Sequence, residues 1–151
     1  MFELSLFLFL IFIGSPFSVF MHELGHALAG IVARATQTTL YLGAGKKLFQ
    51  LRYGRICFVV QRFYIFGGHT INERKSPYTT WELVYITASG PLMNGLVALG
   101  ILLLWNMAAN PYLSILFAFN VWLALGNLVP IRLKGKQTDG YTIMEILRKA
   151  C

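Results

Sequence analysis

Charged side chains are scarce in this sequence. They make up 13% of its 151 residues, only six of them are Asp or Glu, and hydrophobic residues make up 56%. The mean hydropathy of +0.61 is well above that of soluble globular domains. The composition therefore excludes an ordinary soluble domain. It predicts one membrane-embedded domain over residues 1–151.

Cysteine is almost absent as well. Cys57 and Cys151 allow at most one bridge, and their spacing indicates neither a disulfide framework nor a cysteine metal site. We expect both to be free thiols on the reducing side of the membrane. The chain also has no internal repeat and no low-complexity segment, so repeat architectures and linker-joined domains are not predicted.

Three apolar runs predict membrane spans, at about residues 2–32, 83–107 and 112–129. Each is long enough to cross about 30 Å of hydrocarbon at about 1.5 Å per residue. A secretory signal peptide is an alternative for the start of the chain. It fits poorly, because there is no basic leading region, Glu3 has the opposite charge, and no small-residue cleavage site follows.

A β-rich segment is predicted between the first and second spans, at about residues 36–69. It is rich in β-branched and aromatic residues and is punctuated by five glycines, which is typical of short strands joined by tight turns. A short helix is predicted near the C-terminus. The expected fold is thus a mainly α membrane protein with three core spans and a small β-rich segment.

Basic residues cluster between the first and second spans and again after the third. The net charge of +7 is compatible with nucleic-acid binding. The clustering favours membrane orientation instead, so no nucleic-acid partner is expected. Two basic clusters on one side of a three-span protein place that side in the cytosol. We therefore predict the N-terminus outside and the C-terminus in the cytosol.

The motif MHELGH lies late in the first apolar run. On a helix, His22 and His26 share one face, one turn apart, and can bind a single Zn²⁺. Glu23 lies beside them, where it can act as a general base. Chance matches to this motif occur in soluble proteins, but two imidazoles and a carboxylate within a membrane span are costly unless they have a function.

A catalytic zinc usually has three protein ligands and one open position, so a third ligand is required. Asp139 follows the third span, where Thr138 or Asp139 could instead cap a short helix. His69, Glu82 and Glu145 are the other candidates. Residue spacing alone favours Asp139 only slightly.

The sequence resembles the site-2 protease family of intramembrane zinc metalloproteases over nearly its whole length. Besides HELGH, four segments carry the likeness in the family's order: LGAGKKLFQLRYGR followed by FGGH, then SGPLMN, NLVP and the pair Asp139-Gly140. The resemblance implies that Asp139 is the third ligand of one Zn²⁺. It also implies that Asn94 and Asn127 lie near the zinc and hold the substrate or the oxyanion.

The sequence departs from the family pattern at two places. The stretch IRLKGKQT separates NLVP from Asp139 by more residues than is usual. Phe66 replaces the proline common before Gly67, and His69 replaces the aromatic residue common after Gly68. We interpret the second change as an altered substrate-facing edge, along which an unwinding substrate could add as a strand beside Gly67 and Gly68.

The resemblance implies hydrolysis of peptide bonds in membrane-spanning protein substrates within the lipid bilayer, as in regulated intramembrane proteolysis. A catalytically silent zinc-binding relative that acts as a partner-binding protein is the alternative, although an intact Glu23 argues against it. A zinc transporter would need a polar path through the spans, which is missing. Substrate selection is left to the core itself, a regulatory partner or a homo-oligomer. The small residues Gly90, Gly95 and Gly100 would let helices pack closely in the second span, and packing is preferred to a catalytic role for Gly95 and Gly100.

Overall fold

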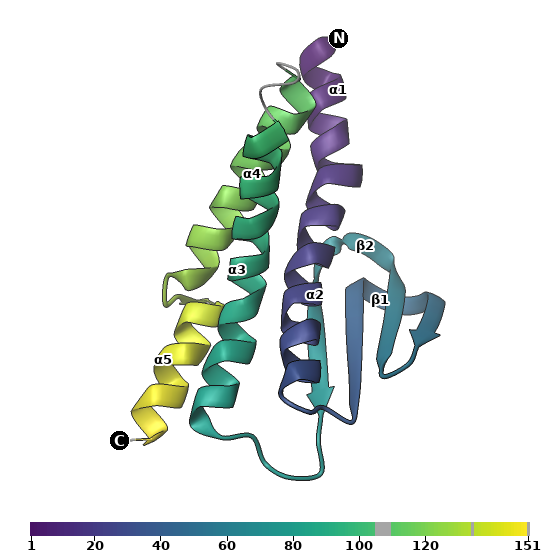
Figure 1. Ribbon diagram of the computed structural model, residues 1–151. Coiled ribbons are helices and arrows are strands. Elements are labelled where there is room, and N and C mark those ends of the chain that lie inside the picture. The colour runs from purple at the N-terminus through teal and green to yellow at the C-terminus, as the bar shows by residue number, and fades with distance from the viewer. Residues whose placement is uncertain (105–109, 134, 151) are drawn as a thin grey trace.

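Three long helices dominate the structure, a computed structural model that describes residues 1–104, 110–133 and 135–150. The first consists of α1 (Phe2–Phe9), a π-helical turn η1 (Leu10–Gly14) and α2 (Ser15–Val32); the others are α3 (Thr80–Leu104) and α4 (Pro111–Leu128). All three are long and apolar enough to cross a membrane. They lie side by side, with the N-terminus at the end opposite α5 (Figure 1).

The π-helical turn precedes Pro16, which lies at the start of α2. A proline inside a helix has no N–H and clashes with the carbonyl four residues earlier, so the extra residue of a π turn relieves the clash. The hydroxyl of Ser18 donates to the Gly14 carbonyl at 2.8 Å. The apolar run therefore continues as one long helix across the proline.

The second span begins at Thr80, three residues before the predicted start, because a capping box precedes it. The Thr79 N–H donates to Glu82 Oε2 at 2.7 Å, and the Glu82 N–H donates to Thr79 Oγ1 at 3.3 Å. Arg74 donates to both carboxylate oxygens of Glu82 and to the Ala33 carbonyl at the end of α2. Glu82 therefore joins the start of α3 to the end of α2.

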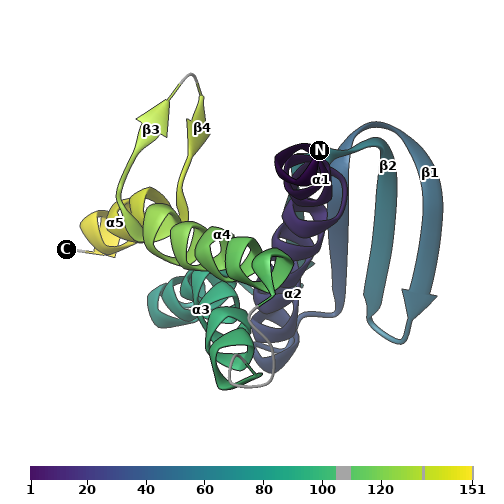
Figure 2. The ribbon, with the colours of Figure 1, turned by 90° about the horizontal axis from the view of Figure 1, so that it is seen from above.

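Two strands form the β-rich segment, β1 (Gln37–Tyr53) and β2 (Ile56–Glu73). The segment ends four residues later than predicted. The first half of β1 lies between the two halves of β2, since Thr38 pairs with both Asn72 and Ile56. The strands curve to one side of α2, while α3 and α4 lie on the other side (Figure 2). The last third of β2 is thereby held against α2.

A small hairpin follows α4. Its strands are β3 (Arg132–Leu133) and β4 (Lys136–Gln137), and α5 (Asp139–Ala150) comes next, as the predicted short C-terminal helix. The Thr138 N–H donates to the Ile131 carbonyl at 3.1 Å, and the Thr138 hydroxyl donates to the Val129 carbonyl at 2.6 Å. The hairpin therefore ends close to where it begins. The extra residues before Asp139 loop out without moving α5 away from α4.

A buried polar cluster joins the three spans. The Asn94 amide donates to the Ser18 carbonyl and to Asn120 Oδ1, both at 2.9 Å, and the Asn120 amide donates to Ser18 Oγ at 2.9 Å. All three side chains are fully buried. Their hydrogen bonds are mutually satisfied, so α2, α3 and α4 are fixed relative to one another.

The expectation of close helix packing at two glycines is wrong. Among the described residues, a Cβ at Gly95 or at Gly100 would meet nothing within 4 Å. Gly25 makes the close contact instead, because a Cβ there would overlap the backbone of Ser89. Cys57 is a buried free thiol, as predicted. Cys151 lies outside the described residues. Residues 105–107, which were predicted to end the second span, lie outside them as well.

Candidate metal centre

The two motif histidines lie on the face of α2 that packs against α3. Their Nε2 atoms are 3.2 Å apart, and both rings occupy the space beside Gly90. A Cβ at Gly90 would lie 2.7 Å from His22 Nε2 and even closer to His26 Nε2. The absence of a side chain at Gly90 therefore lets both imidazoles fit between the helices.

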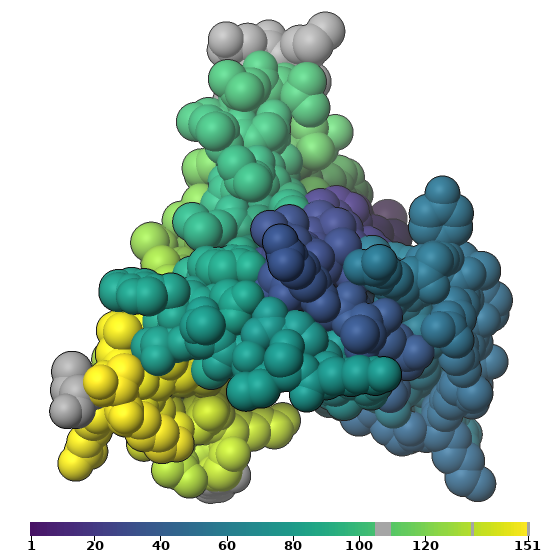
Figure 3. Space-filling view, turned by 60° about the horizontal axis from the view of Figure 1, so that its bottom comes forward, coloured from purple at the N-terminus to yellow at the C-terminus, as the bar shows by residue number. Residues whose placement is uncertain are grey.

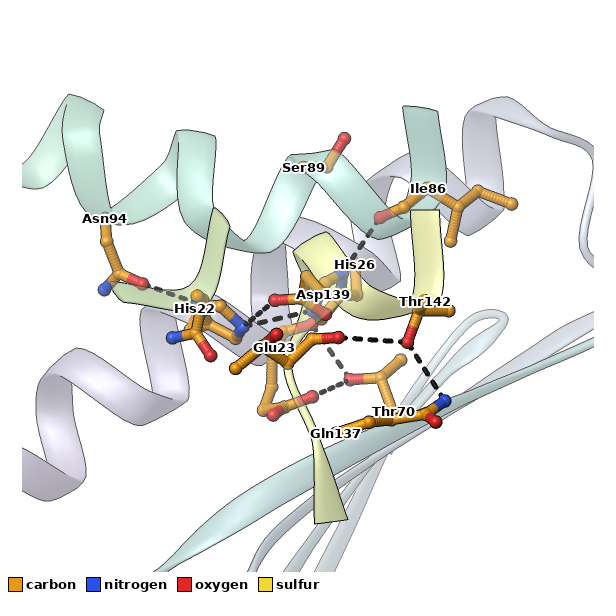
Figure 4. Close-up of polar contacts among 12 residues, drawn as sticks. His22, Glu23, His26, Thr70, Ile86, Ser89, Asn94, Gln137, Asp139 and Thr142 are labelled. Atoms are coloured by element: carbon orange, nitrogen blue, oxygen red, sulfur yellow. Dashed lines mark hydrogen bonds and ion pairs between the residues drawn. The ribbon is translucent and has the colours of Figure 1, made fainter. Parts of the chain in front are cut away.

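The Nδ1 atom of each imidazole has its own hydrogen-bond acceptor on α3. His22 Nδ1 lies 2.6 Å from Asn94 Oδ1, and His26 Nδ1 lies 2.8 Å from the Ile86 carbonyl oxygen (Figure 4). A carbonyl oxygen can only accept, so both Nδ1 atoms carry the proton. In the neutral imidazoles both Nε2 atoms then present lone pairs, and this is the usual outer-shell arrangement of metal-binding histidines.

Asp139, at the start of α5, brings a carboxylate to the same point. Its Oδ2 lies 3.0 Å from His22 Nε2, and its Oδ1 lies 3.5 Å from His26 Nε2. Oδ2 is buried and receives no hydrogen bond within the described part of the chain. The Tyr141 N–H donates to Thr138 Oγ1, so Thr138 caps α5 and leaves the Asp139 side chain free.

The geometry fits a metal ion. The three side chains offer ligand atoms that all lie within 4.8 Å of one another. A tetrahedral zinc site with bonds of about 2.0–2.1 Å separates its ligand atoms by about 3.3 Å, close to the separations observed here. The two Nε2 lone pairs and the partly buried Asp139 carboxylate point at one another with no hydrogen-bond donor from the described residues between them, so they repel one another. A bound cation removes this repulsion.

Glu23 lies beside the candidate metal centre, and Thr70 on β2 holds it there. The Thr70 hydroxyl lies 2.8 Å from Glu23 Oε2 and 3.0 Å from the Glu23 carbonyl oxygen. A Cβ at Gly68 would lie 2.9 Å from Glu23 Cγ and 2.8 Å from the Tyr41 carbonyl oxygen. The small residue at position 68 therefore lets β2 approach Glu23 closely enough for Thr70 to bond it.

A cavity of about 530 Å³ opens in front of these residues. Its walls come from α2, β2, α3, the end of α4 and the start of α5, and the lining residues besides His22, Glu23, His26 and Asp139 include Gly68, His69, Thr70, Asn72, Thr87, Asn127, Gln137 and Thr142. A single opening thus borders the three candidate ligands, the candidate base and a strand.

The other sequence-predicted residues are distributed as follows. Asn127 lines the cavity and donates to the Leu123 carbonyl at 3.0 Å, whereas Asn94 is buried behind His22 and does not line it. Gly67 is adjacent to the lining residue Gly68 and has a φ of 76°. Glu82 is engaged by Arg74, away from the imidazoles. The structure therefore brings Asp139 to the two histidines and leaves His69 in the cavity wall, stacked on Tyr41.

Sequence reasoning missed two contributors to the site, Thr70 and Asn120. Asn120 is an amide within an otherwise apolar run, and a polar residue there is a signal of function or of helix contact. Thr70 carries no such signal, because a threonine is ordinary in a strand. Its contact with Glu23 depends on how β2 lies against α2.

A helical His-Glu-x-x-His motif with a distant carboxylate, set among helices long enough to cross a membrane, defines the class of membrane metallopeptidases. Residues 8–110 match peptidase family M50, and the match covers more than half of the chain. The chain therefore belongs to peptidase family M50, the site-2 protease family. The match includes the motif and Asn94 but ends before Asn127 and Asp139. No curated protein matches the chain.

Membership of this family implies a membrane-associated metalloprotease, and peptidases of the family are zinc-dependent. The three membrane-length helices agree with a membrane location.

Proposed function

We propose that this chain is an intramembrane zinc metalloprotease that hydrolyses peptide bonds of membrane-spanning substrates, as in regulated intramembrane proteolysis. One observation carries the proposal. Two imidazoles with fixed Nδ1 protons and the partly buried Asp139 carboxylate converge on one point, beside the Glu23 carboxylate and a cavity. A site that served only the fold would have no need of a base at the edge of an open cavity.

His22, His26 and Asp139 would hold the ion, and the cavity leaves room for an open coordination position. When bound, zinc polarises the scissile carbonyl and makes water more acidic. Asn94 and the Ile86 carbonyl hold the two rings in orientation. We assign Asn94 this positioning role, because its side chain lies behind His22 and its hydrogen bonds are all used.

Glu23 acts as the general base. Thr70 fixes Oε2, which leaves Oε1 to take a proton from a water molecule in the cavity and later deliver it to the leaving amine. The carboxylate and the imidazoles come from one helix, so the distance between base and ligands is set by the backbone of α2.

The substrate adds as a strand along the end of β2. Residues 68–73 pair with the first half of β1 on one side, and Gly68, Thr70 and Asn72 line the cavity. A transmembrane helix must unwind before its peptide bonds can be attacked. A strand edge beside the site supplies backbone partners for the unwound segment. Asn127, in the cavity wall, would contact the substrate.

The orientation we propose places the N-terminus outside and the C-terminus in the cytosol, since the basic residues after α2 and after α4 are then both cytosolic. A reporter fused after Cys151 that fluoresces only in the cytosol checks this. A fusion that is fully expressed but not fluorescent would show that the C-terminus is outside, contrary to the proposal.

The decisive experiment uses Glu23→Gln in the purified, detergent-solubilised protein with a single-span test substrate. Cleavage should fall by about 10²- to 10⁴-fold because the base is lost. Zinc content should stay at one ion per chain, because the amide leaves the three ligands in place. Glu145→Gln on α5, which does not line the cavity, is the matched control and should cleave normally.

Two results would contradict the proposal. If Glu23→Gln cleaves as fast as the unaltered protein, another group is the base. If the unaltered protein holds zinc but cleaves nothing in a panel of single-span substrates, the chain is a silent, partner-binding relative.

A further inference from the structure

Two further hollows lie away from the metal centre, one between α2 and α3 and one beside the end of α2 and the start of α3. One is an apolar groove of about 360 Å³ whose walls are residues of the two helices, namely Gly25, Leu28, Ala29, Val32, Tyr85, Ser89, Leu92, Met93 and Leu96. None of these residues lines the metal-site cavity. The groove therefore has no part in the proposed hydrolysis.

The other hollow is polar and measures about 420 Å³. It lies where the two helices end, and its lining residues are three cations, three hydroxyls and one carboxylate: Arg34, Arg74, Lys75, Thr36, Ser76, Thr79 and Glu82. Its lining residues are close in sequence to those of the groove at both helices, because Val32 is two residues from Arg34 and Glu82 is three residues from Tyr85. Figure 3 turns this end of the molecule forward, with the end of α2 beside the start of α3.

The polar hollow has a net positive charge, because its three cations face a single carboxylate. Arg74 pairs with Glu82 at 2.8 Å, which cancels one cation against the single carboxylate. The side chains of Arg34 and Lys75 make no ion pair or hydrogen bond with the described residues, and both are exposed. The Thr36 hydroxyl donates to the Glu73 carbonyl, so Ser76 and Thr79 supply the available hydroxyls. Two cations beside two hydroxyls favour a phosphate group.

The backbone of Arg34 adopts an unfavourable conformation. It follows the end of α2 with a φ of 62°. The Arg34 N–H donates to the Ile31 carbonyl and the Ala35 N–H to the Gly30 carbonyl, which is the Schellman ending. Glycine is the usual residue at that position, because a side chain in the left-handed region costs about 1–2 kcal/mol. An arginine with this φ, whose side chain lines the polar hollow, points to a function for that side chain.

We propose that the groove and the polar hollow together bind one anionic phospholipid, with its phosphate at Arg34 and Lys75 and one acyl chain between α2 and α3. The polar hollow lies at the ends of two membrane-length helices, where lipid head groups lie. From Tyr85 to Leu96 the groove extends about 16 Å along α3, close to one leaflet's hydrocarbon depth of about 15 Å. The exposed Trp81 at the start of α3 is typical of the membrane interface.

The test measures lipid retained by the detergent-solubilised protein in native mass spectrometry, with dioleoylphosphatidylglycerol and dioleoylphosphatidylcholine compared. The anionic lipid should bind preferentially. Combining Arg34→Gly with Lys75→Gln should weaken its binding by about 30-fold, since each cation near a membrane surface contributes about fivefold. The matched control is Arg148→Gln with Lys149→Gln, two exposed cations of α5, and it should bind as the unaltered protein does.

The Arg34→Gly variant separates binding from folding. In lipid-free detergent its unfolding midpoint should rise, because glycine relieves the positive φ, while its affinity for the anionic lipid falls. Leu92→Trp should weaken lipid binding without any change of charge, because it fills the groove.

Three outcomes would overturn the proposal: equal retention of the two lipids, full binding by the double variant, or full displacement of the lipid by glycerol phosphate. The last would show that a soluble phosphate suffices and that the groove holds no acyl chain.

Discussion

Gly90 is the residue on which the fit of both imidazoles depends. We expect Gly90→Ala to abolish stoichiometric zinc binding, because the new Cβ would overlap His26 and lie 2.7 Å from His22 Nε2. The rings cannot easily move aside, since each is hydrogen-bonded to α3. Cleavage should fall by about 100-fold or more, as for other small misplacements of catalytic groups. Metal analysis and a cleavage assay measure the two effects.

Gly95→Ala on the same helix is the control for this change. None of the residues that the structure describes lies within 4 Å of its Cβ position, so zinc should be retained. The helix should gain about 0.5–1 kcal/mol because alanine is the better helix former. Equal zinc content in the Gly90 and Gly95 variants would show that the rings repack, contrary to our expectation.

Asn94 should govern zinc affinity although it does not face the cavity. Asn94→Ala removes the acceptor that fixes the tautomer and orientation of His22, and losses of such outer-shell partners weaken metal binding about 10- to 100-fold. Competition with a chelator of known affinity measures the change. Asn127 donates to the Leu123 carbonyl and not to an imidazole. The variant Asn127→Ala should therefore keep zinc and alter only substrate binding. A reversed pattern would contradict the positioning role of Asn94.

At the scale of elements, we expect that the metal centre does not require the full length of the β3–β4 hairpin. Replacing residues 133–136 with an Asn-Gly turn keeps the pairing of Arg132 with Gln137. Thr138 then still bonds the carbonyls of Val129 and Ile131. We expect zinc content to be unchanged in metal analysis, because these bonds place Asp139.

Thr138→Val makes the opposite change. It keeps the hairpin but removes the hydroxyl that caps α5 and bonds the end of α4. It should cost about 1 kcal/mol of helix stability and weaken zinc binding. If the shortened hairpin loses zinc and Thr138→Val keeps it, the hairpin itself positions the carboxylate.

The elements differ in how far the sequence could predict them. The spacing of His22, Glu23 and His26 determines their shared helix face, so that part of the site follows from the chain alone. Whether Asp139 reaches them depends on hydrogen bonds around Thr138 that no spacing reveals. Thr79 and Glu82 form a readable capping box, so the true start of α3 could have been found. The Thr70 contact depends on the packing of β2 on α2 and could not.

At the scale of the whole molecule, the metal centre joins the first long helix to the short helix α5. Removing zinc with a chelator should lower the unfolding midpoint of the protein in detergent. Zinc at about 100 times its dissociation constant contributes about 2.7 kcal/mol. The bare Asp139 carboxylate would also face two imidazole lone pairs, so hydrogen exchange in α5 should rise most.

Asp139→Ala should lose zinc and show no further response to the chelator. If this variant keeps full zinc content, the third ligand is elsewhere, and His69 in the cavity wall becomes the candidate.

Ser18, Asn94 and Asn120 have a consequence for how the molecule tolerates change. Hydrophobicity does not favour one rotation of an apolar helix about its axis in lipid, because all of its faces are equally apolar. Turning α2 by a single residue would strand two carboxamides and a hydroxyl in hydrocarbon. Exchanging one exposed leucine or phenylalanine for another apolar residue should thus leave the site intact, while three small polar groups keep the imidazoles facing α3.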